Sequence, residues 1–177
     1  METGKPKKPS FLEKLGFFPS FHISHITRYA SHHCSMKAYV TGGTGFIGSH
    51  LVELLVAQGY QVTCLVRKTS HLRWLNHLCA DKSSPIQLVT GELHDSDALA
   101  QSLQDADLVF HLAGVTTAPD AATYDWVNAL GTQRLIEACL RANSRLSRFV
   151  YCSSLAAIGP SPTPTPITEN AVPQPLT

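Results

Sequence analysis

From residue 36 onward, short apolar runs alternate with longer stretches in which apolar side chains recur every three or four residues. The runs are typical of strands buried on both faces, and the longer stretches of helices with one buried face. The predicted strands are 37–41, 61–66, 86–90, 106–112 and 148–153, and the predicted helices are 46–57, 71–78, 95–103 and 121–142. This alternation predicts an α/β fold, a Rossmann-type doubly wound parallel sheet in the order 3-2-1-4-5, incomplete with the five strands present.

The same spacing predicts which side chains face the core. In the first helix the apolar positions are Phe46, Ile47, Leu51, Leu54 and Leu55, and in the last they are Val127, Leu130, Leu135, Ile136 and Leu140. Asp95 or Ser96 is expected to cap the helix that follows the third strand.

Three regions follow from these patterns. Residues 1–35 show no sustained periodicity, which indicates a disordered extension or, if Met36 is the natural start, an over-long gene prediction. Residues 36–159 form the predicted domain. Residues 160–177 are rich in proline, which can continue neither a sheet nor a helix, and we interpret them as a loop at which the chain is truncated.

Composition excludes several classes of protein. The chain is 44% hydrophobic and 15% charged with a net charge of +1, which gives no bias toward nucleic acid or an acidic membrane surface. No apolar stretch approaches the ~20 residues that a membrane helix needs, so we expect no membrane partner and a cytoplasmic location.

The cysteines and histidines suggest neither disulfides nor a metal site. The five cysteines are odd in number and lack a C-x-x-C pair, and Cys64 and Cys152 lie in apolar runs that predict burial in a reducing compartment. A cluster near the N-terminus matches no compact zinc spacing, so no metal is expected; it consists of His22, His25, His32, His33 and Cys34.

A glycine-rich turn joins the first strand to the first helix, with the sequence T-G-G-T-G-F-I-G at residues 41–48. Gly42 allows the tight turn, Gly45 allows backbone N–H groups to approach a pyrophosphate, and Gly48 allows the helix to pack closely on the sheet. The first helical residues, Phe46 and Ile47, stand at a positively polarised helix N-terminus that suits a diphosphate. The turn therefore predicts a dinucleotide site.

The G-x-x-G-x-x-G spacing resembles the extended short-chain dehydrogenase/reductase family, the NAD-dependent epimerase/dehydratase and dihydroflavonol-reductase-like group. Four further segments of residues 36–177 resemble it in order: G-E-L at 91–93, H-L-A-G at 111–114, N-A-L-G-T at 128–132 and the stretch 148–159. The resemblance implies that the cofactor is contacted by Glu92 (where the family has Asp), Leu93, Leu112, Ala113, Gly114 and Asn128.

The residue after the second strand bears on the choice of cofactor. An NAD site usually has an acid about 20 residues after the glycines, to bond the ribose 2′-hydroxyl. Arg67 and Lys68 stand there instead, and a guanidinium can bind a 2′-phosphate in bidentate fashion. We therefore predict NADP; if Arg67 is only a solvated strand end, NAD is the alternative.

The resemblance implies that Ser154 is the catalytic serine, which bonds a substrate hydroxyl or carbonyl. The family's acid/base is the Tyr of Tyr-x-x-x-Lys, but the residues four positions after the five tyrosines are His33, Gly43, Cys64, Asn128 and Leu155. We therefore expect no appreciable turnover from this chain alone, and a small-molecule substrate only if the missing C-terminal part is supplied.

Two other interpretations stay open. In the first, the chain is a non-enzymatic NADP-binding sensor or interaction module. In the second, it is a truncated product without function. An incomplete sheet exposes apolar surface, which disfavours a stable monomer and favours a homo-oligomer.

Overall fold

A computed structural model describes residues 35–79 and 83–175. The predicted extension, apart from its last residue Ser35, and the histidine and cysteine cluster near the N-terminus lie outside these residues. The fold described below is that of the remaining chain, which clusters as one unit from Ser35 onward.

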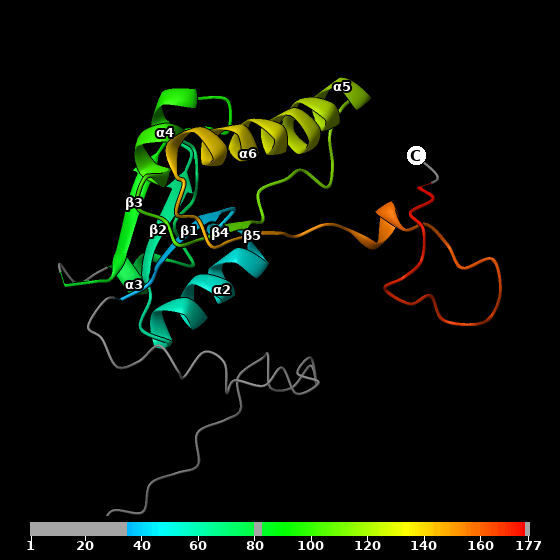
Figure 1. Cartoon of the computed structure of the whole chain (residues 1–177), viewed down its shortest axis with the longest axis horizontal. Coiled ribbons are helices and arrows are strands. Elements are labelled where there is room, and N and C mark those ends of the chain that lie inside the picture. Colours follow the sequence, from blue (N-terminus) through cyan, green and yellow to red (C-terminus); the bar gives the residue numbers. More distant parts are fainter. Residues whose placement is uncertain (1–34, 80–82, 176–177) are drawn as a thin grey trace, which may run out of the picture. The chain divides into compact units, whose positions relative to one another are not determined.

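The domain is built on a five-stranded parallel sheet (Figure 1). Its strands are β1 Lys37–Thr41, β2 Gln61–Val66, β3 Ile86–Thr90, β4 Leu108–His111 and β5 Arg148–Tyr151. They lie in the order β3-β2-β1-β4-β5, and every neighbouring pair is parallel. The predicted fold class and strand order are confirmed.

Helices cover both faces of the sheet (Figure 1). One face carries α2 Phe46–Ala57 and the short α3 Asn76–Cys79, and the other carries α4 Ser96–Leu103 and α6 Gly131–Ala142. The predicted long helix is divided, because α5 Ala121–Tyr124 runs into a π-helix, Asp125–Leu130, which then continues as α6. A 3-10 turn, Leu155–Ala157, follows β5, and residues 160–175 form neither helix nor strand.

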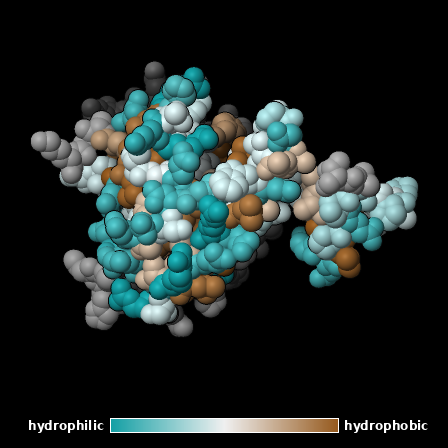
Figure 2. All heavy atoms as spheres, turned by 90° about the horizontal axis from the view of Figure 1, so that it is seen from above, coloured by the Kyte–Doolittle hydropathy of each residue, from teal (hydrophilic) through white to brown (hydrophobic). Residues whose placement is uncertain are grey.

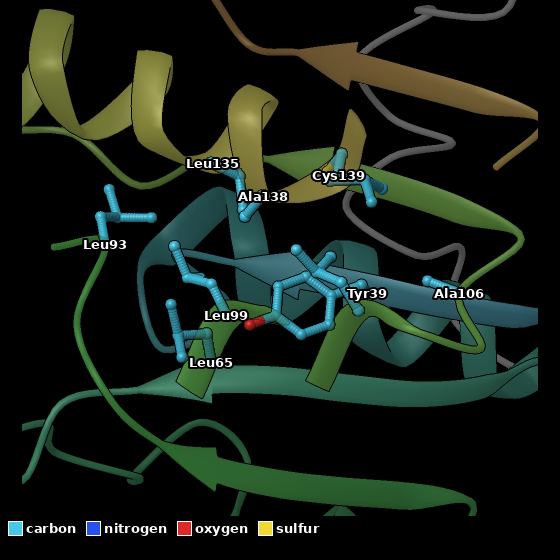
Figure 3. Packing of buried hydrophobic residues seen from close by; sticks show 10 residues of the cluster. Tyr39, Leu65, Leu93, Leu99, Ala106, Leu135, Ala138 and Cys139 are labelled. Atoms are coloured by element: carbon cyan, nitrogen blue, oxygen red, sulfur yellow. The ribbon is translucent and has the colours of Figure 1, made fainter. Parts of the chain in front are cut away.

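Each face of the sheet has its own apolar core. Under α4 and α6, Tyr39 packs with leucines from both helices (Figure 3). Under α2 and α3, the cluster is made of side chains from β1, β2 and the helices, including Val40, Val52, Leu55, Val62 and Leu75. Asp95 is the cap of α4, with its Oδ1 accepting a hydrogen bond of 3.0 Å from Ala98 N–H.

The predicted inward face of α2 is partly wrong. Phe46 and Ile47 are 57% and 62% exposed, and Leu54 is exposed as well. The helix instead turns Gly48, Ser49, Val52 and Leu55 toward the sheet. The reason lies at its first turn, where Gly48 packs directly on the Gly42 carbonyl and thereby fixes the rotation of the helix.

The prediction for the last helix holds at Leu135 and fails at three positions from the end of the π-helix onward. Leu135 is fully buried, but Leu130, Ile136 and Leu140 are exposed, Leu140 by 78%. A π-turn bonds residue i to residue i+5, so it adds one residue to the helix and rotates everything that follows. Figure 2, which views the side of α4 and α6, shows apolar side chains scattered among hydrophilic ones on that face.

Two smaller differences concern α3 and the cysteines. The predicted helical turn 71–78 is regular only from Asn76 to Cys79. Cys64 is buried as predicted, but Cys152 is exposed because β5 forms an edge of the described sheet. Within the described residues, no helix combines the length and apolarity that crossing a membrane requires.

Candidate functional site

The carboxyl ends of β1 to β4 surround a cavity of about 330 Å³. This is the edge of an open parallel sheet at which ligands usually bind. The lining comes from five segments: Thr41, Gly42, Thr44 and Gly45; Leu65, Arg67 and Ser70; Gly91 to His94; Leu112 to Val115; and Trp126 with Val127. A larger hollow of about 580 Å³ lies at the amino ends of the strands, between residues such as Gln61 and Asp105, and has no part of the glycine turn in its lining.

The glycine turn packs its backbone against the chain that leaves β4. Gly42 has a φ of 75°, and a Cβ there would lie 2.6 Å from the Ala113 nitrogen. The Gly45 N–H donates a 3.0 Å hydrogen bond to the Gly42 carbonyl, and a Cβ on Gly48 would overlap that same carbonyl. A side chain is therefore excluded at Gly42 and at Gly48, and at Gly42 the backbone itself lines the cavity beside Thr41 and Thr44.

Helix α2 points its N-terminus at the cavity. Its N-cap is Gly45, which has no side chain to bond the first N–H groups, and no acid occupies the first turn. The first N–H groups of a helix lack intrahelical acceptors and carry partial positive charge, so this end suits a phosphate. The side chains of Phe46 and Ile47 are exposed and are not part of the cavity lining of the described residues, so contact between these residues and a cofactor stays a prediction.

An aromatic stack borders the cavity beside the end of β3. The imidazole of His94 stacks on the Trp126 indole, with ring centroids 4.0 Å apart. Arg134 donates to His94 Nδ1 over 2.7 Å and lies over the same indole at 5.0 Å. Burial first, and then Arg134, lower the pKa of His94, which keeps its ring neutral. Sequence reasoning missed this group. Trp126 reaches His94 from the π-helix, and the spacing of apolar residues along the chain gave no indication of that π-helix.

Asn128 holds the loop after β4 in place. Its Oδ1 accepts from the Val115 N–H at 2.8 Å, and its Nδ2 donates to the Val115 carbonyl at 3.0 Å. Both ends of the carboxamide are thus engaged with the loop, and Asn128 is outside the cavity lining of the described residues. Its direct contact with a cofactor stays a prediction.

His111 lies fully buried behind the cavity, at the end of β4. Its Nδ1 is 2.6 Å from Thr41 Oγ1, and its Nε2 is 2.8 Å from Thr132 Oγ1. Burial lowers the pKa of His111 to about 4, so the imidazole is neutral near pH 7.

Arg67, Glu92 and Leu93, which sequence reasoning singled out, line the cavity, as do Leu112, Ala113 and Gly114. The Arg67 N–H donates to Ser70 Oγ at 3.1 Å, so that hydroxyl lies close to Arg67. Ser154 is elsewhere: it is exposed, and its Oγ accepts from Ala156 N–H at 3.2 Å as the cap of the 3-10 turn. A catalytic role for Ser154 stays a prediction.

Comparison with known proteins adds a family to this geometry. The NAD dependent epimerase/dehydratase family matches residues 38–177. A dihydroflavonol 4-reductase-like protein of Synechocystis is 41% identical over 123 residues, which cover 68% of this chain and 33% of that protein. The 3 beta-hydroxysteroid dehydrogenase type 7 of Rattus norvegicus is 34% identical over 128 residues, 69% of this chain and 36% of that protein. The chain thus spans about a third of the length of these curated relatives.

Two solved structures with the same fold contain NAD. The UDP-glucose 4-epimerase of Brucella ovis in complex with NAD is similar over 80% of this chain and 42% of its own, with a TM-score of 0.68 and 29% identity. The Bordetella bronchiseptica enzyme WbmH in complex with NAD+ is similar over 81% of this chain and 47% of its own, with a TM-score of 0.68 and 26% identity.

Proposed function

Because the chain belongs to the NAD-dependent epimerase/dehydratase family, we propose that residues 36–159 bind a nicotinamide dinucleotide in the cavity at the carboxyl ends of β1 to β4. The observation that carries the proposal is the glycine turn, in which a Cβ at Gly42 or Gly48 would overlap backbone atoms. The residues present fit a dinucleotide, since backbone and a helix N-terminus face the cavity where a diphosphate needs N–H donors.

The remaining lining fits the rest of such a cofactor. Glu92 and Leu93 offer a carboxylate and an apolar wall on the β3 side, where the resemblance implies the adenine. The loop 112–115, which Asn128 holds in place, also lines the cavity. When bound, the cofactor supplies or accepts a hydride. The chain's part is to bind and orient it and to keep water from one face.

We further propose that the 177-residue chain binds without turnover. No tyrosine in it is followed four positions later by lysine, so the acid/base pair of the family must come from a region that the longer relatives contain. Ser154 is then the substrate-bonding serine of the assembled enzyme, and the substrate is a small molecule with a hydroxyl or carbonyl group.

The first prediction is that NADPH titrated into the purified chain binds saturably in calorimetry and changes the fluorescence of Trp126, which lines the cavity. Trp74, the other tryptophan, is absent from that lining, so a Trp74→Phe variant should retain the signal and a Trp126→Phe variant should lose it. No heat and no fluorescence change would contradict the proposed function. Oxidation of NADPH in the presence of a panel of ketones would contradict only the proposed lack of turnover and not the proposed binding.

The second prediction concerns NADP preference, which rests on Arg67. Residues 67–70 contain two cations and two hydroxyls but no carboxylate, and Arg67 lines the cavity beside the Ser70 hydroxyl. Arg67→Ala should lower the affinity for NADPH about tenfold, which is the effect of one lost charge-assisted hydrogen bond. It should change the affinity for NADH by less than about twofold.

Arg73→Ala is the matched control, because it removes the same charge from a side chain that stacks on Trp74 and has no part in the cavity lining. If both variants weaken NADPH equally, the preference is a general charge effect. If the unchanged chain binds NADH as tightly as NADPH, the predicted NADP preference is wrong.

A further inference from the structure

A buried hydrogen-bond network connects three of the five segments that line the cavity. His111, the last residue of β4, lies between Thr41, the last residue of β1, and Thr132 in α6. The Thr41 hydroxyl also accepts from the Ala113 N–H at 3.3 Å, and the Thr132 hydroxyl donates to the Asn128 carbonyl at 2.6 Å. The network therefore runs from the loop after β4, through the base of the glycine turn, to the π-helix.

The partners fix the direction of every bond in this network. A carbonyl only accepts, so the single hydrogen of Thr132 goes to Asn128, and Thr132 must accept from a protonated His111 Nε2. In the neutral ring Nδ1 then has no hydrogen and accepts from the Thr41 hydroxyl. Thr41 in turn has lone pairs left to accept from Ala113. The donors therefore run in one direction, from the Ala113 N–H through Thr41, His111 and Thr132 to the Asn128 carbonyl. The other neutral tautomer would leave Thr132 without a hydrogen for one of its two partners.

The Ala113 end of the network lies at the tightest place in the cavity wall. Ala113 N is the atom that a Cβ on Gly42 would meet at 2.6 Å, so the spacing between the turn and the loop has little slack. Thr41, which receives the Ala113 N–H, is also the residue before Gly42. A change in the His111–Thr41 bond therefore acts directly on the backbone that lines the cavity.

We infer that His111 is a positioning residue for dinucleotide binding, which acts through Thr41 on the glycine turn and through Thr132 on the π-helix. The inference rests on the proposed function. His111 itself has no part in the cavity lining of the described residues, so its effect reaches the ligand only through the segments that it connects.

The test is a double-mutant cycle on the two threonines that flank the ring. Valine has the shape of threonine but its side chain neither donates nor accepts, so neither substitution opens a cavity. Thr41→Val removes the bonds of that hydroxyl to His111 and Ala113, and Thr132→Val removes the bonds of its hydroxyl to His111 and Asn128. Each variant should lower the affinity for NADPH between about threefold and tenfold, which is the range of one net hydrogen bond. The double variant should bind NADPH less than about twofold more weakly than the single variant with the larger loss, because both substitutions act through one ring. Thr132→Ser, which keeps the hydroxyl, should bind like the unchanged chain.

Ser102→Ala is the control for simple loss of stability. It removes a hydrogen bond to Tyr39 in the core under α4, away from the cavity, and should lower the melting temperature with an unchanged Kd for NADPH. All titrations use the full 177-residue chain at a temperature at which circular dichroism shows each variant folded. If Thr41→Val does not fold, Thr132→Val and Thr132→Ser carry the test.

The outcomes separate the two claims. If the unchanged chain does not bind NADPH or NADH, the proposed function fails. If it binds and Thr132→Val binds equally well, or if the effects of the two valines add fully, His111 does not position the site and only the inference is overturned.

Discussion

Gly42→Ala should abolish dinucleotide binding, with a loss of at least about a hundredfold in affinity. Two effects combine at this position. The backbone has a φ of 75°, where a residue with a Cβ is disfavoured by roughly 1 kcal/mol, and the new Cβ would lie 2.6 Å from both the Ala113 nitrogen and the Leu112 carbonyl carbon. Backbone cannot rotate aside as a side chain does, so the turn and the β4 loop must separate, and overpacking of this kind costs about 1–3 kcal/mol more.

Gly59 offers a matched control for this prediction. It ends α2 with a φ of 84°, nearly the same backbone conformation, but a Cβ there would meet nothing within 4 Å. Gly59→Ala should therefore show the conformational penalty alone, as a lower midpoint in urea, and bind NADPH with an unchanged Kd. Measured by calorimetry on folded protein, equal affinity in the two variants would mean that the glycine turn does not form the binding wall.

The strands and the glycine turn could be predicted because their signals are local. Apolar runs such as 61–66, closed by turn residues, match the observed β2 at both ends. The strand order followed from the right-handedness of βαβ connections, a rule that needs no knowledge of individual contacts. The turn at residues 42–48 was recognisable because its glycines are required by backbone geometry, which a sequence records directly.

The faces of the helices could not be predicted in the same way. Rotation of α2 is fixed by one backbone contact, Gly48 against the Gly42 carbonyl, and rotation of α6 by the preceding π-helix. Neither contributes to a count of apolar residues at helical spacing, so Ile47 and Leu140 were assigned inward and are exposed. The Ile47 error lies beside the candidate site and the Leu140 error near the other end of α6, and at both positions tertiary packing overrides the local pattern.

The polar part of the site was also hidden from sequence reasoning. His111 and Thr132 are 21 positions apart, and His94 and Trp126 are 32 apart, so their pairing depends on the packed positions of β4, α6 and the π-helix. The sequence singled out the stretch 111–114 only through the family resemblance, which gives no role for the histidine. Its role as a neutral ring that both accepts and donates follows from the partners around it.

The burial of His111 also predicts how stability depends on pH. The ring contacts the Thr41 and Thr132 hydroxyls, Tyr151 at 5.5 Å and Phe149 at 6.2 Å, and none of these contacts is a charged group. Burial lowers its pKa from 6.5 to about 4. A protonated Nδ1 could also no longer accept from Thr41, whose hydroxyl hydrogen would lose that partner, so the network disfavours the charged ring as well.

Stability should therefore fall as the pH falls from about 6.5 to about 4. Below about pH 4, His111 contributes no further decrease, because the ring is then protonated in both the folded and the unfolded state. Above pH 6.5 the folded and unfolded states are both neutral at His111 and the group contributes no pH dependence. Between the two pKa values only the unfolded state binds the proton, which favours unfolding by up to about 3 kcal/mol over the whole interval. Urea unfolding at several pH values should show this fall in the unchanged chain and a fall smaller by that amount in His111→Asn, whose side chain does not titrate.

His71→Gln, which removes an exposed imidazole outside both cores, is the control for losing a histidine. If His111→Asn is less stable at pH 7 but follows the same slope as the unchanged chain down to pH 4, the buried ring is not the group that resists protonation.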